Sequence, residues 1–174
     1  MMRIIIVIPP KDFKDESISE ITSMFKKWKV EYVFSSSIIG KCYGYHGAEV
    51  VSTTKYSDIA SEDFDGMILI NGPGFEEYKL YDSRIILDLF RHFNEKGKLI
   101  ACIGNTIKAL AKANIITNKK IAFVKDPETV RFAKLFRGIV TENLLESDGN
   151  IITATNSEKA AEFSKLIVEQ LGII

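Results

Sequence analysis

The chain is poor in several features that mark particular classes of protein. It has only two cysteines, Cys42 and Cys102, in 174 residues. Two cysteines are too few for a disulfide framework, so we expect a reducing, cytoplasmic location. The two histidines, His46 and His92, are not spaced as metal ligands, and we predict neither a metal nor a cofactor. Basic and acidic residues both number 23, so no excess charge favours binding to nucleic acid or to an anionic membrane.

Long apolar runs and nucleotide-binding motifs are also missing. The apolar start MMRIIIVIPP is followed at once by charged KDFKDES. A signal peptide needs a longer apolar region with a cleavage site, and a membrane span needs roughly 20 apolar residues. Neither GxxxxGK[ST] nor a dinucleotide fingerprint occurs. The chain does contain 46% hydrophobic residues, enough for a substantial core, and we predict one domain over residues 1–174.

Short apolar runs alternate with helical patterns along the whole sequence. Runs typical of buried parallel strands occur at Arg3–Ile8, Val30–Phe34, Gly66–Ile70 and Lys98–Ile103, with a further strand candidate at Lys120–Val124. Helical spacing of apolar residues occurs in Asp15–Trp28, Ser83–Asn94, Thr106–Ala113, Pro127–Phe136 and Glu158–Leu171. This alternation predicts a three-layer α/β/α sandwich with a mostly parallel central sheet.

Two segments have the composition of β-hairpins. The segment 35–54 is rich in glycine and serine and contains two β-like pieces, Lys41–Tyr45 and Ala48–Ser52, which predict a hairpin outside the main sheet. Asp148-Gly149 is a strong turn signal between Asn143–Ser147 and Asn150–Ala154. The sequence therefore predicts a second hairpin near the carboxyl terminus.

Local signals also predict where other elements begin and end. Asn71-Gly72-Pro73-Gly74 follows a buried strand and is predicted to form a tight turn. Ser157 is predicted to cap the last helix, and Gly172 to end it.

The chain is organised around Lys98–Ile116, KLIACIGNTIKALAKANII. A buried strand ends at Gly104-Asn105-Thr106, and a helix follows. In α/β proteins such a junction, at the carboxyl end of a central strand, is where ligands and nucleophiles lie. Glycine, asparagine and threonine include no activated nucleophile. The junction has the form of a reactive site without the residue that would react.

Several segments together resemble the ThiJ/PfpI family, within the class I glutamine amidotransferase-like superfamily. They are DFKDES, SSSIIGKCYGYHGAEV, FDGMILINGPGFEEY, GKLIACIGNTIKALAKANII and SDGNIITATNSEKAAEFSKLIVEQL, and in order they cover nearly the whole chain. The resemblance implies a flavodoxin-like fold and a homo-dimer or higher homo-oligomer. It also implies a site with three parts: a cysteine at the elbow between strand and helix, a glutamate on the first helix, and a glycine-rich turn that donates a backbone N–H to an oxyanion.

This sequence departs from the family pattern at each part. Gly104 stands where the family has its cysteine, and Asn105 stands where it has histidine. Ser17 falls at the place of the glutamate, with Glu16 one position earlier. Pro73 falls where a glycine donates its N–H, and proline has none. Covalent chemistry needs nucleophile, proton partner and oxyanion site together, so the resemblance implies a member that has lost catalysis.

The first functional interpretation is therefore non-catalytic. The protein would bind a small polar or anionic ligand, act as a chaperone-like partner, or support an assembly, and no cofactor is expected. The candidate ligand-binding residues are Gly72, Gly74, Gly104, Asn105, Thr106 and His46. An alternative is a hydrolase, amidase or glyoxalase-type enzyme that uses a shifted residue, Cys102 or Glu16. A third interpretation is a structural subunit that pairs with an active paralogue.

Ordinary structural roles compete with these hypotheses. Cys102 can be a buried core thiol, and Glu16 a favourable charge at a helix start. His92 is expected to be solvated on a charged helix face. Cys42, in the glycine-rich hairpin, is expected to be an exposed neutral thiol.

Overall fold

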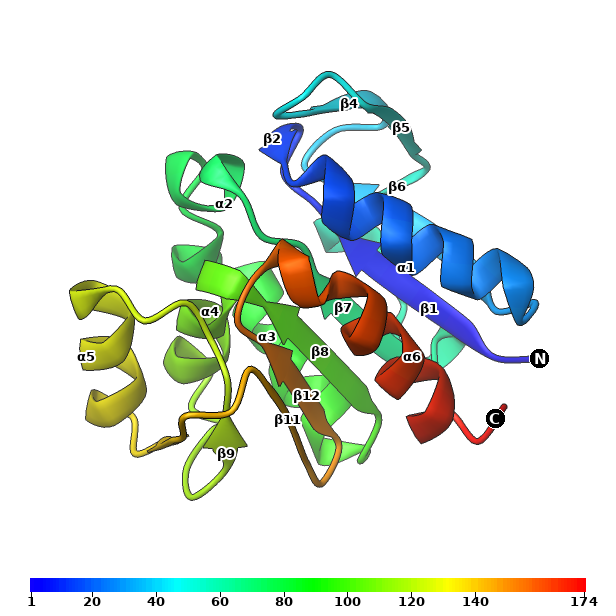
Figure 1. Ribbon diagram of the computed structural model, residues 1–174. Helices are drawn as coiled ribbons and strands as arrows, with labels where there is room; N and C mark the ends of the chain where they lie inside the picture. The colour runs from blue at the N-terminus through cyan, green and yellow to red at the C-terminus, as the bar shows by residue number, and fades with distance from the viewer.

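The computed structural model describes all residues, 1–174, as helices packed on both faces of a seven-stranded sheet (Figure 1). The strand order is β11-β12-β8-β7-β1-β3-β6. The strands are β1 (Arg3–Val7), β3 (Glu31–Ser36), β6 (Thr54–Lys55), β7 (Gly66–Leu69), β8 (Leu99–Ile103), β11 (Leu145–Asp148) and β12 (Ile151–Ala154). All neighbours pair in parallel except β11, which is antiparallel to β12. The predicted three-layer, mostly parallel fold is confirmed.

The helices form two layers that bury opposite faces of the sheet. Helices α1 (Asp15–Lys27) and α6 (Ala160–Gln170) cover one face, and α3 (Arg84–Glu95) and α4 (Ile107–Lys112) cover the other (Figure 1). Successive residues of a strand point to opposite faces. Because both faces are covered, the strands are apolar at every position, which is the pattern visible in the sequence. Helix α5 (Pro127–Leu135) packs against α4.

The predicted hairpin outside the main sheet is confirmed. Strands β4 (Gly40–Gly44) and β5 (Glu49–Ser52) pair antiparallel, and β2 (Lys11–Phe13) joins them in a separate small sheet (Figure 1). The sequence did not predict β2, because three residues are too few to form an alternating pattern. The exposed thiol predicted for Cys42 is wrong. Cys42 is fully buried between this small sheet and the core.

The Asp15 carboxylate fastens the hairpin to the start of α1. It accepts hydrogen bonds from the backbone N–H groups of His46, at 2.9 Å, and Ala48, at 2.7 Å. Burial by itself raises the pKa of Asp15, but these two hydrogen bonds outweigh it and lower the pKa below its usual value. The ionised carboxylate is therefore the form that holds the turn.

The strand predicted at Lys120–Val124 is mostly wrong. Only β9 (Lys120–Ile121) is extended, and it pairs with β10 (Ile139–Val140) outside the main sheet. The next N–H, of Ala122, donates to the Thr153 hydroxyl at 2.8 Å. The apolar run continues because Phe123 and its neighbours fill the core, and burial alone does not make a strand.

Two local predictions also need correction. The tight turn predicted at Asn71–Gly74 continues into a short helix, α2 (Pro73–Glu77), whose first position suits proline because no N–H is needed there. The cap of the last helical segment is Asn156, and Ser157 is not the cap. The Asn156 side chain accepts from the Glu158 N–H at 2.9 Å. The Ser157 hydroxyl instead forms a hydrogen bond with the Ser17 hydroxyl.

The remaining predicted elements are present. The Asp148-Gly149 hairpin joins β11 and β12, and Gly172 adopts a positive φ just beyond α6. No helix in the fold combines the length and the apolar character needed to cross a bilayer.

Candidate functional site

A pocket of about 230 Å³ lies where β7, β8 and β12 end at the carboxyl edge of the sheet. Ligands of α/β proteins bind at this edge. The pocket is lined by Lys14, Asn71, Gly72, Pro73, Gly104, Asn105, Val124, Thr155 and Asn156. Three of the predicted ligand-binding residues, Gly72, Gly104 and Asn105, are thus brought together. The other lining residues come from loops far apart in the sequence.

Gly104 forms the elbow at the end of β8, and a side chain there would crowd Asn71. Its φ is +68°, in the left-handed region that glycine adopts without steric cost. A Cβ at this position would lie 3.0 Å from both Cβ and Nδ2 of Asn71. The side chain of Asn71 therefore occupies the space beside the elbow, and both backbone and packing favour glycine here.

Asn71 belongs to a buried cluster of neutral polar side chains. The Ser17 hydroxyl donates to Asn71 Oδ1 at 2.8 Å, and the hydroxyls of Ser17 and Ser157 lie 2.8 Å apart. Asn71 Nδ2 also donates to Ser157 Oγ at 3.2 Å. The cluster ties the first turn of α1 to the loop after β7 and to the segment that leads into α6. It satisfies the buried Ser17 and Asn71 without any ionisable group.

The sequence analysis did not predict Asn71 as a site residue, and it predicted Ser157 as a helix cap. Asn71 was visible as the first residue of the Asn-Gly-Pro-Gly turn. No local signal pairs it with Ser17, which lies 54 positions away along the chain.

Glu16 and His46 meet each other and do not line the pocket. Glu16 Oε1 lies 3.4 Å from His46 Nε2, and the two side chains are 49% and 57% exposed. An ion pair this exposed contributes little to stability. The structure therefore places both residues on the surface beside the hairpin.

Two other predicted ligand-binding residues have local structural contacts. Thr106 is buried, and its hydroxyl donates to the Ile103 carbonyl at 2.7 Å and accepts from the Ile103 N–H at 2.9 Å. Gly74 lies so close to β2 that a Cβ would be 2.0 Å from the Lys11 carbonyl oxygen. Neither lines the pocket.

Both cysteines are buried among apolar side chains. Cys102 is 1% exposed, and burial raises the pKa of its thiol to about 12. Burial also raises the pKa of Cys42. Thiolate is the reactive form of cysteine, and burial disfavours that form at both positions.

A buried lysine supports the wall of the pocket behind Asn105. Lys108 Nζ lies 2.7 Å from Glu76 Oε1 and 3.2 Å from Glu128 Oε2, with its side chain only 3% exposed. Burial alone would lower the pKa of Lys108, but the hydrogen bonds to the two carboxylates raise it. Asn105 Nδ2 also lies 3.4 Å from Glu76 Oε1 and from the Gly72 carbonyl. The ammonium therefore links α2, α4 and α5 and fixes the orientation of Asn105.

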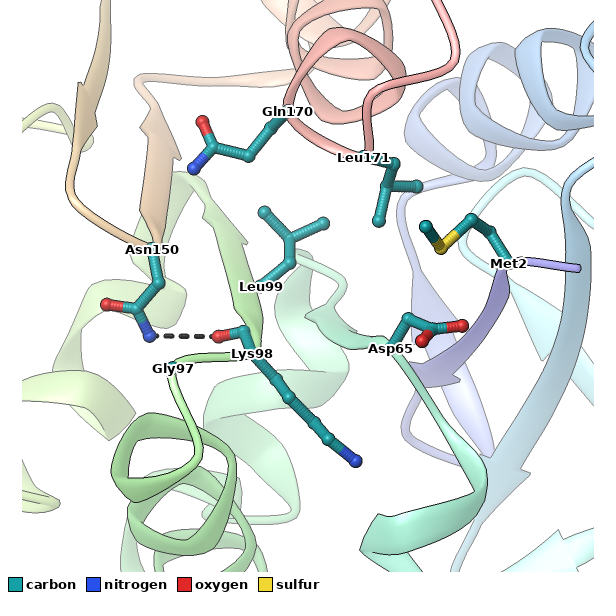
Figure 2. Close-up of a pocket in the computed structure, with 8 residues that line it drawn as sticks. All are labelled: Met2, Asp65, Gly97, Lys98, Leu99, Asn150, Gln170 and Leu171. Carbon is teal, nitrogen blue, oxygen red and sulfur yellow. Dashed lines mark hydrogen bonds between the residues drawn. The ribbon is translucent and has the colours of Figure 1, made fainter.

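A second pocket, of about 270 Å³, lies at the opposite edge of the sheet (Figure 2). Its polar groups have partners within the protein. Asn150 Nδ2 donates to the Lys98 carbonyl at 2.8 Å, and Gln170 Nε2 to the Gly149 carbonyl at 2.8 Å. Asp65 accepts from the Arg3 N–H at 2.8 Å. These polar groups already have partners within the fold, so the pocket at the carboxyl edge is the candidate site.

Comparison with known proteins agrees with this geometry. Residues 2–170 match the model of the DJ-1/PfpI family. The uncharacterized protein MJ0967 of Methanocaldococcus jannaschii is 27% identical over 169 residues, which cover 97% of this chain and 82% of that protein. The glutathione-independent glyoxalase DJR-1.2 of Caenorhabditis elegans is 26% identical over 171 residues, 96% of this chain and 87% of the relative.

The same architecture is found in solved structures. The crystal structure of a ThiJ/PfpI domain protein from Brachyspira murdochii superposes with a TM-score of 0.92, at 22% sequence identity. The match covers 99% of this chain and 97% of that chain. At this level of identity the likeness establishes the fold.

Proposed function

This chain belongs to the DJ-1/PfpI family, and from that premise we propose that it is a non-catalytic member that binds a small polar ligand at the carboxyl edge of the sheet. The filled elbow carries the proposal. Gly104 stands where the family resemblance calls for the nucleophilic cysteine, and the Asn71 side chain takes up the space beside it. A reactive side chain cannot be accommodated there without moving Asn71.

The other two parts of the family's site support the same conclusion. Ser17, at the place of the family's glutamate, is hydrogen-bonded to Asn71 and Ser157 and offers no carboxylate to activate a nucleophile. Pro73 begins α2 and has no N–H for an oxyanion. All three changes remove groups needed for covalent catalysis, while the pocket itself persists.

The family includes glyoxalases and proteins described as proteases, but the geometry does not favour such an activity here. Turnover would need a reactive group that reaches the pocket. Cys102 is in the core with a raised pKa, and Glu16 pairs with His46 on the surface. Among the non-catalytic roles, an open pocket at this edge favours ligand binding over a chaperone-like or purely structural role.

An activity and labelling experiment tests the proposal. The wild type is assayed with glyoxal and with casein, beside the double variant Cys42→Ser/Cys102→Ser and the variant Glu16→Gln. We expect no rate above buffer for any of them. We also expect both thiols to resist alkylation at neutral pH until the protein is unfolded. Turnover by the wild type that either variant abolishes, or rapid native labelling of Cys102, would overturn the proposal in favour of a shifted nucleophile.

A further inference from the structure

We propose that the pocket at the carboxyl edge recognises a small neutral molecule that donates a hydrogen bond, and that Asn105 Oδ1 is the atom that accepts it. This inference rests on the proposed binding function and names the chemistry of the ligand. It is carried by an acceptor without a partner in the wall of the pocket, and by the contacts that hold the rest of the Asn105 amide.

The oxygen of the Asn105 side chain has no hydrogen bond within the protein. Asn105 lines the pocket, and its Oδ1 is buried and unpartnered. The chain has one other buried side-chain polar atom without a partner, Ser36 Oγ, and Ser36 does not line the pocket. Buried polar groups almost always have a partner, and an unsatisfied one lowers stability. The free oxygen therefore indicates a donor that the protein itself does not supply.

The neighbours of the amide determine which of its two ends is left without a partner. Asn105 Nδ2 lies 3.4 Å from the Gly72 carbonyl and 3.4 Å from Glu76 Oε1. A carbonyl and a carboxylate only accept hydrogen bonds, so the opposite orientation of the amide would place Oδ1 against two other oxygens. The nitrogen therefore belongs on that side, and the oxygen is the atom that lacks a partner.

The two contacts that hold the amide can be broken at little cost. Both are longer than the roughly 2.7–3.2 Å of a typical N–H···O hydrogen bond. The Gly72 carbonyl also accepts from the Phe75 N–H at 3.2 Å. Glu76 Oε1 also binds Lys108 Nζ, at 2.7 Å. Neither acceptor is therefore left unsatisfied when the Asn105 amide rotates away from it.

Rotation of the amide is the step that brings its oxygen to a ligand. Oδ1 is closed to solvent in this structure, so a donor in the pocket reaches it only after the side chain of Asn105 has rotated. The hydrogen bond to the ligand then gives the oxygen the partner that it lacks. This gain favours a ligand with a donor over one without.

The lining of the pocket also restricts the charge and the size of the ligand. None of its nine residues is acidic, so a cationic donor finds no counter-charge. An anion such as a carboxylate only accepts hydrogen bonds and does not supply a donor. A neutral group with an N–H or O–H meets both conditions. The volume of about 230 Å³ is below the range of roughly 300–1,000 Å³ typical of drug-sized ligands, so the molecule is small.

The test is an NMR titration of the ¹⁵N-labelled protein with propionamide and with N,N-dimethylformamide. The two compounds are isomers and both carry an amide carbonyl, but only propionamide has N–H groups. We expect propionamide to shift the backbone amides of Gly72 and Gly104 and the side-chain NH₂ signal of Asn105. It should bind about fivefold or more tightly than its isomer, as expected for one added hydrogen bond. Propionate, at constant ionic strength, should bind more weakly than propionamide.

The variant Asn105→Leu identifies the accepting atom, because leucine has a similar size and no polar atom in its side chain. We expect it to remove the difference in affinity between the two isomers. Asn94→Leu is the matched control. Asn94 Oδ1 accepts from Asn150 Nδ2 at 3.2 Å, at the opposite edge of the sheet, so this variant should keep the full preference for propionamide. The amide spectrum of each variant shows whether it is folded.

The outcomes separate this inference from the function on which it rests. Equal binding of the two isomers by the wild type would overturn the inference, and that comparison needs no variant to fold. A preference that persists in Asn105→Leu would mean that another atom accepts the hydrogen bond, and tighter binding of propionate would favour an anion site; both would also overturn it. If no probe shifts these signals, the inference is wrong, whereas the non-catalytic proposal is judged by the separate activity assay.

Discussion

At the scale of single residues, Gly104 and Asn71 determine what the site can do. Gly104 combines a left-handed backbone with close contact to the Asn71 side chain. Either feature alone favours glycine, and together they disfavour any side chain at the elbow unless Asn71 shifts. Asn71 is in turn held by Ser17 and Ser157, so the elbow and the buried polar cluster form one unit.

The first prediction compares Gly104→Ala with Gly97→Ala. The comparison separates the cost of a left-handed backbone from the cost of crowding Asn71. Gly97 has nearly the same φ, +67° against +68°, but a Cβ there would meet nothing within 4 Å. We expect Gly97→Ala to lower the free energy of unfolding by about 1 kcal/mol through backbone strain. Gly104→Ala should cost a further ~1–3 kcal/mol because Asn71 must move.

Urea unfolding followed by circular dichroism measures both changes. Equal losses of unfolding free energy in the two variants would mean that Asn71 moves aside without an energetic cost. The Asn71 side chain would then not restrict the space beside Gly104.

At the scale of elements, the hairpin β4–β5 depends on one carboxylate at the start of α1. Asp15 binds two backbone N–H groups of the turn between these strands, 46–48. A Cβ at Gly44 would meet this carboxylate at 2.4 Å, so glycine is needed for the close approach. The hairpin and the pocket-lining Lys14 are thus positioned by adjacent residues of the same segment.

The second prediction concerns the pH dependence of this attachment. The pKa of Asp15 is lowered in the folded protein, so its contribution to stability is present above its ordinary pKa, about 3.9. The contribution is lost as the pH falls through the lowered value. We expect Asp15→Asn to remove this pH dependence and to speed amide exchange at His46 and Ala48 at neutral pH.

Amide hydrogen exchange, followed by NMR, measures how fast the His46 and Ala48 amides exchange in each variant. The pH is varied from about 3 to about 7, which brackets the ordinary carboxyl pKa of about 3.9. Asp63→Asn is the control, because Asp63 is exposed and forms no ion pair. If exchange in the turn is the same in Asp15→Asn as in the wild type, the carboxylate does not hold the hairpin.

At the scale of the whole molecule, the sheet places the ends of β7, β8 and β12 side by side. The pocket is therefore made from segments near residues 14, 72, 104 and 155, and no single stretch of sequence contains it. The pocket at the opposite edge has polar side chains that already donate to backbone carbonyls, as Asn150 does to Lys98 (Figure 2) and Gln170 does to Gly149. This difference between the two edges favours the carboxyl edge of the sheet as the place of the site.

The third prediction is also made at this scale, and it follows from the family resemblance. We propose that the chain forms a homo-dimer, so light scattering after size exclusion should give twice the chain mass of 19.6 kDa. A mass equal to one chain at all concentrations tested would contradict it.

Some features were determined by the sequence alone because they depend on neighbouring residues. The apolar runs of β1, β7 and β8, the helical period of α3 and the Asp148-Gly149 turn are local signals, and the structure confirms the elements that they predict. The glycine at the elbow was visible in the same way. The strand predicted at Lys120–Val124 failed because an apolar run reports burial, and burial is common to strands and to packed loops.

Other features were decided only by the tertiary structure, because they depend on residues far apart along the chain. The pairing of Ser17 with Asn71, the burial of Cys42 and the meeting of distant loops at the pocket arise from strand order and layer packing. The sequence by itself therefore determined the family, the fold class and the presence of a glycine at the elbow. Only the folded chain determined which side chain lies beside that glycine and which residues line the pocket, since these are properties of contacts between distant segments.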